Sequence, residues 1–356
     1  MGSAVRKVVE VAVLVLVSAC TGAPDLDYSR MPEFLYVPVN ATGVVDRRLE
    51  FANLFCTLLE AEEAFSGRPC TDYLHLEDPE GVQNIEIPRL RPERLRYLIV
   101  PGYGSECFAD VATPFEGARE VLQGEGIDVA LMMVPGLAST ARNAEFIARS
   151  LRLEPDQPAK DVVLIGYSKG LADILEAVVE YPDALSRVVA VVGVSGVVNG
   201  SPNASDAPML LRMLANLPLS SCAGADADTE GIESIGYEYR QNWLSAHRLD
   251  ARILYFSLAA YATVDEISSG LKSAYRRLAR IDPRNDGLMI YRDAVIPDSY
   301  LLALARGDHW AVAMPFTESN AVVRAIVADR NSFPRTVLLR SIMIAVQREL
   351  DAREGR

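Results

Sequence analysis

The sequence has few of the residues and motifs that define several large classes of protein. It has only three histidines (His75, His247 and His309), no HExxH motif and no paired CxxC motifs, so we expect no metal site. Its formal net charge is −13, which argues against nucleic acid as a partner because phosphate binding needs clustered Lys and Arg. No segment of about 20 to 50 residues repeats, which excludes solenoids and propellers.

The N-terminus has the features of an export signal. Arg6-Lys7 precedes an apolar run over 8–17 that only Glu10 interrupts, and small residues follow the run. The run is about half of the roughly 20 residues that a membrane-spanning helix needs. Val17-Ser18-Ala19-Cys20 resembles a bacterial lipobox. The resemblance implies a signal peptide over 1–19, lipidation of Cys20 and an exported lipoprotein, at the outer membrane or at the cell surface or periplasmic face. An ordinary secretory signal is the alternative.

Export would place the other four cysteines in an oxidising compartment, where disulfides form. They are Cys56, Cys70, Cys107 and Cys222. We expect at least one disulfide, with three pairings open. Cys56–Cys70 closes the shortest loop and would leave Cys107–Cys222 as the second bond.

The chain beyond the signal divides into an N-terminal part and a regular part. Residues 20–94 are expected to form a tether and an extension that contains a helix over 47–65, and residues 95–356 a single domain. In the second part, apolar strands alternate with helices, which predicts an α/β fold: a mostly parallel central sheet with helices on both faces. Strands are predicted over 96–100, 128–134, 161–165, 187–194, 252–258 and 300–305, and helices over 109–123, 140–151 and 171–181. Residues 198–248 interrupt the alternation and are expected to form a helical cap.

The segment Gly166-Tyr167-Ser168-Lys169-Gly170 fits the pattern G-x-S-x-G between a predicted strand and an amphipathic helix. A sharp turn there lifts the serine oxygen off the sheet, and the flanking glycines leave room for the strained backbone. The helix N-terminus offers partial positive charge to a developing oxyanion. Ser168 is therefore the candidate nucleophile. Gly193-Val194-Ser195-Gly196 also ends a strand but lacks the second glycine at the required spacing.

Residues 96–316 resemble the α/β-hydrolases, with turns similar to those of lipases and esterases. In that family the order along the chain is nucleophile, acid and histidine. The resemblance gives the place of the histidine to His309, which follows the last strand in Gly-Asp-His-Trp. His75 precedes the sheet and His247 lies in the insertion, so both are expected to be packing or surface residues.

The acid is assigned to Asp286, in an Asn-Asp-Gly turn similar to the acid-bearing turn of bacterial lipases. A predicted helix over 267–280 separates it from the preceding strand, which departs from the simplest family pattern. Asp265 therefore stays open as the first alternative and Asp293 as the second.

The resemblance also implies an oxyanion hole made of two backbone N–H groups, from Lys169 and from Tyr103 in Pro101-Gly102-Tyr103-Gly104. The Lys169 side chain is expected to form a solvated ion pair with Asp173 one turn later. A dinucleotide fingerprint is rejected because Cys107 stands where the third glycine should be.

These residues predict a serine carboxylic-ester hydrolase, lipase- or esterase-like, that acts through an acyl-enzyme on small-molecule or lipid esters and needs no cofactor. The Leu- and Met-rich insertion would cover an acyl pocket or pack on the sheet edge. Thioesterase, acyltransferase and peptidase activities use the same residues, and a non-catalytic lipid-anchored binding protein is the alternative of another class.

Overall fold

The computed structural model describes residues 43–107, 109–152, 160–205, 230–316, 325 and 328–355, all within a unit that spans Leu35–Arg356. Cys20 and Cys222 lie outside the described residues. Within these ranges the centre of the fold is a seven-stranded sheet in the order β1-β7-β6-β5-β4-β2-β3, with every pair parallel. The strands are β1 (Val45–Asp46), β2 (Leu95–Val100), β3 (Val129–Leu131), β4 (Asp161–Tyr167), β5 (Val188–Val194), β6 (Leu254–Tyr261) and β7 (Tyr300–Arg306).

The central strands are continuous apolar runs because helices cover both faces of the sheet. Strand β5 reads Val-Val-Ala-Val-Val-Gly-Val and is almost wholly buried. Strand β3 is shorter than predicted, because it lies at the sheet edge and pairs only with β2. The register places Val100 beside Gly166, and Gly166 beside Gly193, so the carboxyl ends of β2, β4 and β5 meet at one edge.

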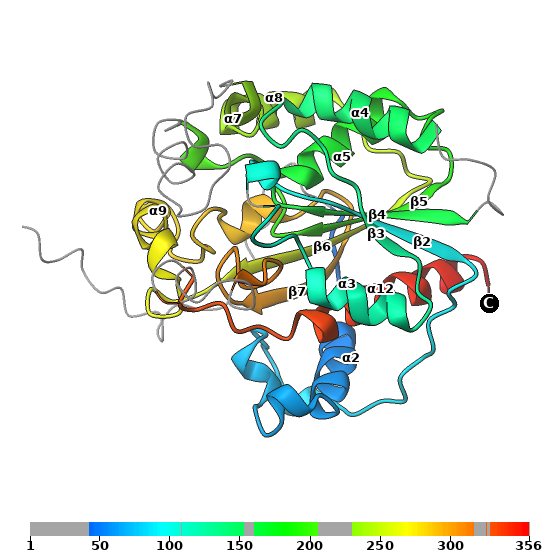
Figure 1. Ribbon diagram of the computed structural model, residues 1–356, viewed down its shortest axis with the longest axis vertical. Helices are drawn as coiled ribbons and strands as arrows, with labels where there is room; N and C mark the ends of the chain where they lie inside the picture. Colours follow the sequence, from blue (N-terminus) through cyan, green and yellow to red (C-terminus); the bar gives the residue numbers. More distant parts are fainter. Residues whose placement is uncertain are drawn as a thin grey trace, which may run out of the picture. The chain divides into compact units, whose positions relative to one another are not determined.

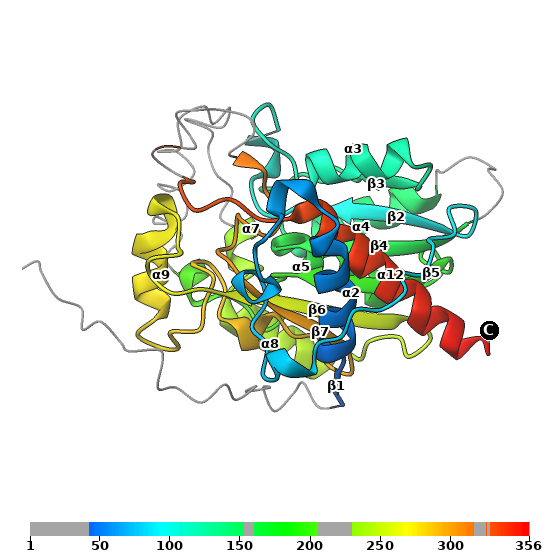
Figure 2. The same ribbon diagram turned by 90° about the horizontal axis from the view of Figure 1, so that it is seen from below.

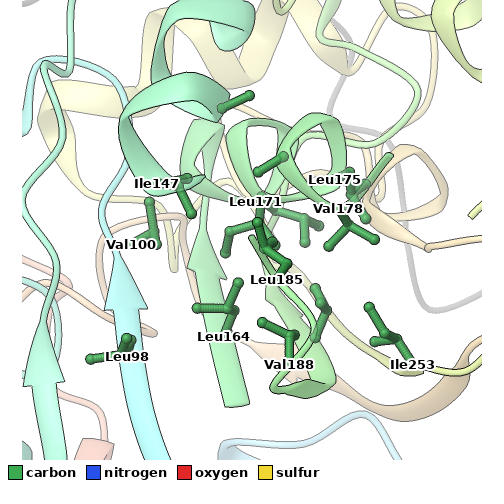
Figure 3. Close-up of a cluster of buried hydrophobic side chains, with 14 of the residues drawn as sticks. Leu98, Val100, Ile147, Leu164, Leu171, Leu175, Val178, Leu185, Val188 and Ile253 are labelled. Atoms are coloured by element: carbon green, nitrogen blue, oxygen red, sulfur yellow. The ribbon is translucent and has the colours of Figure 1, made fainter. Parts of the chain in front are cut away.

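Helices form a layer on each face of the sheet (Figure 1). On one face lie α4 (Thr140–Arg152), α5 (Lys169–Glu180) and α8 (Tyr237–Ala246), and on the other lie α2 (Arg48–Glu60), α3 (Glu116–Gly124) and α12 (Arg335–Arg353). A buried cluster joins the first layer to the sheet: Leu98, Val100 and Leu164 from the strands meet Ile147, Leu171 and Leu175 from the helices (Figure 3). The predicted α/β fold with helices on both faces is therefore confirmed.

The N-terminal extension contributes to the sheet and to its second helical layer. Strand β1 pairs with β7, and α2 packs against both β7 and α12 (Figure 2). Helix α2 ends at Glu60, and a short 3-10 turn, Glu63–Phe65, completes the segment that was predicted as one helix. Helix α12 was not predicted, because its apolar residues are spread around the helix instead of forming one stripe.

Helix α3 begins at Glu116 and not at the predicted residue 109. Pro114 lacks a backbone N–H, and Phe115 adopts a left-handed conformation with φ 55°, which stops the helix from extending further toward the N-terminus. The Glu116 carboxylate instead accepts hydrogen bonds from the backbone N–H and the hydroxyl of Thr113.

A disulfide links Cys56 on α2 to Cys70 in the following loop, which confirms that the chain carries at least one. Cys107 is also disulfide-bonded. Its predicted partner Cys222 is outside the described residues.

The described parts of the insertion contain three helical segments, which are the 3-10 helix Pro202–Ser205, α7 (Glu230–Glu233) and α8. Trp243 of α8 belongs to the buried cluster that also contains Leu171 and Leu175 of α5, so α8 is part of the core packing. Among the helices that the structure describes, none has both the length and the apolar character needed to cross a bilayer.

Candidate active site

Ser168 lies in the turn between β4 and α5, at the carboxyl edge of the sheet. Its φ of 55° and ψ of −127° put it in a sparsely populated conformation, which for a residue with a side chain is strained. The turn is held from both sides: the Ser168 N–H donates to the Val194 carbonyl at 3.2 Å, and the Ser168 carbonyl accepts from the Val197 N–H at 2.9 Å. The serine is thus fixed at the end of the central strands.

The glycines of the motif allow this turn to pack tightly. A Cβ on Gly166 would lie 2.4 Å from Leu171 Cα, and one on Gly170 would lie 2.2 Å from the carbonyl oxygen of Val100. Real Cβ atoms do not approach so closely. Glycine is therefore required at both positions for α5 to start directly against the sheet.

Asp286 and His309 are joined by both side-chain and backbone contacts. His309 Nδ1 is 2.8 Å from Asp286 Oδ2, and the His309 backbone N–H donates to the Asp286 carbonyl at 2.8 Å. Asp286 Oδ1 accepts from the backbone N–H groups of Leu288 and Met289 at 2.9 and 2.6 Å. Both members of the pair are buried. A carboxylate oxygen accepts hydrogen bonds, so this geometry suits an Nδ1–H donor, and in the neutral imidazole with that proton Nε2 is an acceptor.

The Asn-Asp-Gly turn holds Asp286 by local chemistry. The Asn285 side chain accepts from the Gly287 N–H at 3.0 Å, and Gly287 has a φ of 96°, which glycine adopts without strain. On the histidine side, the Tyr167 hydroxyl donates to the His309 carbonyl at 2.9 Å. Tyr167 precedes Ser168, so the serine and histidine turns are tied to each other.

Asp308, beside His309, is a second buried carboxylate at the site. It accepts from the backbone N–H groups of Ser268 and Ala311, each at 2.8 Å. Burial is the main cause that raises the pKa of Asp308 to about 6, and the nearby Asp286 carboxylate adds to it.

The alternative residues lie apart from this pair. Asp265 is exposed, and Asp293 is paired with the Tyr237 hydroxyl of α8. His75 stacks on Tyr261 with 3.7 Å between ring centroids, and His247 stacks on Trp243. The structure therefore brings Asp286 to His309 and neither of the other two acid candidates.

The loop after β2 lies against the serine. A Cβ on Gly102 would be 2.8 Å from Ser168 Cβ and 3.2 Å from Ser168 Oγ, so the Gly102 backbone contacts the serine side chain directly. Tyr103 follows Gly102, and Lys169 follows Ser168 at the start of α5. The candidate oxyanion donors Tyr103 and Lys169 therefore directly follow two residues that contact each other, Gly102 and Ser168.

The predicted ion pair of Lys169 with Asp173 is present, but it is buried, so the prediction that solvent surrounds it is wrong. Lys169 Nζ is 2.6 Å from Asp173 Oδ1, and both side chains are only 1% exposed. Asn143 of α4 donates to the other Asp173 oxygen at 2.8 Å, and Arg240 of α8 pairs one turn further on with Glu176 at 2.7 Å. Helices α4 and α8 cover this side of α5. The covering residues come from distant parts of the chain, so the sequence around Lys169 gives no sign of the burial.

Ser168 and His309 line one cavity that is partly open to solvent. Its walls are mainly apolar and come from several loops: Tyr103, Pro114, Val197, Ile235, Leu288, Met289, Trp310, Met314 and Phe316. Apart from Tyr103, the sequence gives no sign of these wall residues, because they belong to short irregular segments that carry no periodic signal. In the part of the chain that the structure describes, no group of three or more His, Cys, Asp or Glu side chains is arranged to hold a metal ion.

Solved structures show what this fold and sequence are similar to. The metagenomic carboxyl esterase MGS0156 is 34% identical, with a TM-score of 0.76 over 90% of this chain and 97% of that one. Lipase BlEst2 of Bacillus licheniformis in its mature form is 20% identical, with a TM-score of 0.49 over 64% of this chain and 89% of that one. Neither the protein-family models nor the curated protein sequences give a match. On the identity and coverage shared with the carboxyl esterase, the chain belongs to the α/β-hydrolase family of esterases and lipases.

Proposed function

We propose that this protein hydrolyses carboxylic esters through an acyl-enzyme on Ser168. The observation that carries the proposal is the 2.8 Å contact between Asp286 and His309, in a cavity that Ser168 also lines. The similarity to a carboxyl esterase supports the reaction class. The order Ser168, Asp286, His309 is that of the family.

In the proposed reaction, His309 Nε2 takes the proton of the Ser168 hydroxyl as the oxygen attacks the ester carbonyl. Asp286 holds the Nδ1–H tautomer and stabilises the imidazolium that forms. The backbone N–H groups of Tyr103 and Lys169 donate to the oxyanion of the tetrahedral intermediate. Collapse of the intermediate breaks the bond to the alcohol, which takes the proton from His309. Water then attacks the acyl-enzyme while His309 takes its proton. Collapse of the second tetrahedral intermediate breaks the bond to Ser168, which takes the proton back from His309, and the carboxylic acid leaves.

The cavity walls favour substrates with an apolar acyl or alcohol part. Five apolar side chains line the cavity together with the nucleophile: Leu288, Met289, Trp310, Met314 and Phe316. When apolar surface of the substrate leaves water for contact with such side chains, the binding free energy becomes more favourable by about 25 cal/mol per Å². We therefore expect esters with a hydrophobic chain to be preferred over short polar ones.

The first experiment compares the protein with Ser168→Ala on p-nitrophenyl esters of increasing acyl length, together with labelling by a fluorophosphonate. We expect the variant to lose activity and labelling. Ser195→Ala is the matched control: Ser195 also follows a strand directly and has a positive φ. Its buried hydroxyl has no hydrogen-bond partner among the residues that the structure describes, so its removal should leave both readouts unchanged. An inactive parent that is not labelled would instead favour the non-catalytic binding protein.

We also propose that Cys20 carries a lipid and holds the exported enzyme at a membrane surface. The support is the lipobox-like segment that ends at Cys20 and the apolar run before it. Metabolic labelling with an alkyne fatty acid should mark the parent and not Cys20→Ala. Equal labelling of the two, or none in either, would contradict the anchor.

A further inference from the structure

The loop over residues 102–107, here the oxyanion loop, carries the second proposed oxyanion donor. Its backbone turns twice, through hydrogen bonds from the Ser105 N–H to the Gly102 carbonyl at 3.3 Å and from the Cys107 N–H to the Gly104 carbonyl at 2.9 Å. Gly102 at its start touches the Ser168 side chain. The distance between the Tyr103 N–H and a reacting carbonyl therefore depends on what holds this loop.

Glu106 fastens the oxyanion loop to the turn after β3. Glu106 Oε2 accepts from the Gly136 N–H at 2.9 Å, and Oε1 accepts from the Leu137 N–H at 3.2 Å. One carboxylate thus binds two successive backbone amides of a turn that the Ala138 N–H closes onto the Pro135 carbonyl at 3.0 Å. Hydrogen bonds to an ionised carboxylate are about twice as strong as neutral ones.

The two loops are packed as closely as glycine allows. A Cβ on Gly136 would lie 2.2 Å from Glu106 Oε2, 2.8 Å from the Ser105 nitrogen and 2.9 Å from the Gly104 nitrogen. On its other side the same turn touches α7, because a Cβ on Gly231 would be 2.1 Å from the Leu137 carbonyl oxygen. The turn is thus fixed between α7 and the oxyanion loop, and it can serve as a rigid support.

We propose that Glu106 is a positioning residue for the reaction: its contacts with Gly136 and Leu137 hold the oxyanion loop where the Tyr103 N–H meets the oxyanion. The inference rests on the proposed function, in which that N–H is a donor. Glu106 acts through the loop and touches no reacting atom. It matters more in the transition state than in the bound ester, because the oxyanion is the charge that the donor stabilises.

The test uses Glu106→Gln in the full-length protein. A glutamine keeps the size of the side chain, but its amide nitrogen faces one of the two N–H groups, so one hydrogen bond is lost and a donor meets a donor. We expect kcat on p-nitrophenyl butyrate to fall about 10- to 50-fold with KM within about twofold of the parent. The inhibition constant of a trifluoromethyl ketone, which forms a tetrahedral adduct with serine, should rise by the same factor.

Glu116→Gln is the matched control, because Glu116 also accepts from a loop backbone N–H, that of Thr113 at 3.0 Å, and lies outside the oxyanion loop. It should change neither kcat nor the inhibition constant. A Glu106→Gln variant whose kcat and inhibition constant stay within twofold of the parent, while fluorophosphonate still labels Ser168, would overturn the inference and leave the proposed function intact.

Hydrogen exchange tests the contact of Glu106 with the turn at Gly136 and Leu137 even if the proposed function fails. In Glu106→Ala, the amides of residues 102–107, 136 and 137 should exchange faster than in the parent, with no change in α12. Unchanged exchange of these amides would overturn the inference that Glu106 holds the oxyanion loop, whatever the activity of the variant. Full activity in Ser168→Ala would overturn the proposed function and the catalytic consequence of Glu106 together.

Discussion

Among single residues, Asp286 is held so firmly that its two oxygens cannot exchange roles. Oδ1 accepts from two backbone N–H groups, which leaves only Oδ2 to meet His309. In Asp286→Asn the amide oxygen must take the Oδ1 place, so the amide nitrogen faces Nδ1 and forces the other histidine tautomer. We expect kcat to fall about 10⁴-fold with little loss of stability. Asp265→Asn, at an exposed position, should keep the kcat of the parent in the same p-nitrophenyl ester assay. Equal losses in the two variants would reject Asp286 as the acid.

Asp308 gives the fold a pH dependence of known sign. Its pKa is raised from 3.8 to about 6 in the folded protein, mainly by burial, so the folded state binds the proton more tightly than the unfolded chain. The contribution of this protonation to the free energy of unfolding is fully present below pH 3.8 and is lost as the pH rises through about 6. The loss amounts to about 3 kcal/mol at most.

Asp308→Asn removes this titration. Between about pH 4 and pH 7, the free energy of unfolding of the parent should therefore fall relative to that of the variant, by up to about 3 kcal/mol in urea denaturation. The variant also loses one of the backbone hydrogen bonds that Asp308 accepts, which lowers its stability at every pH. A difference between parent and variant that stays constant with pH would contradict the prediction.

At the scale of elements, the position of α5 depends on close approach between its first turn and the end of β2. In Gly170→Ala the new Cβ would meet the carbonyl oxygens of Val100 and Pro101 at 2.2 and 2.5 Å. The end of β2 must then move, and Gly102 with it. We expect the free energy of unfolding to fall by about 1 to 3 kcal/mol and kcat to fall about tenfold.

The matched substitution is Gly124→Ala at the end of α3, where a Cβ meets nothing within 4 Å. Alanine is the better helix former, so this variant should be as stable as the parent or more stable by up to about 1 kcal/mol. Urea denaturation and ester kinetics on the two variants separate the effect of contact from that of glycine replacement. The prediction for Gly170 would be wrong if both variants behaved alike.

At this scale the sequence predicts well those features whose signal lies within a few neighbouring residues. The apolar strands, the G-x-S-x-G turn and the Asn-Asp-Gly turn each carry their signal within a few residues. Helix α12 is missed because its apolar residues are spread around the helix. The burial of Lys169 and the contact of Glu106 with Gly136 depend on residues from other parts of the chain. Local periodicity cannot report contacts of that kind.

At the scale of the whole molecule, the Cys56–Cys70 disulfide closes a short loop on the second helical layer. The bonded residues are 14 apart in sequence, and a loop of about that length stabilises a fold by about 3 kcal/mol when the unfolded chain is constrained. Cys56→Ala/Cys70→Ala should therefore lower the free energy of unfolding by about 2 to 4 kcal/mol. Because neither cysteine lines the cavity, kcat should not change. A variant of unaltered stability in urea would contradict this estimate.

The pairing of α2 with α12 has a consequence for how the chain matures. During synthesis α2 emerges among the first elements, with Phe51, Leu54 and Phe55 on the face that becomes buried. Its partners β7 and α12 are made much later, and β1 likewise pairs only after β7 has been made. The N-terminal elements of this protein therefore cannot fold as each leaves the ribosome. A nascent chain that stops before residue 335 keeps the apolar face of α2 exposed, which makes it a substrate for chaperones until α12 has been made.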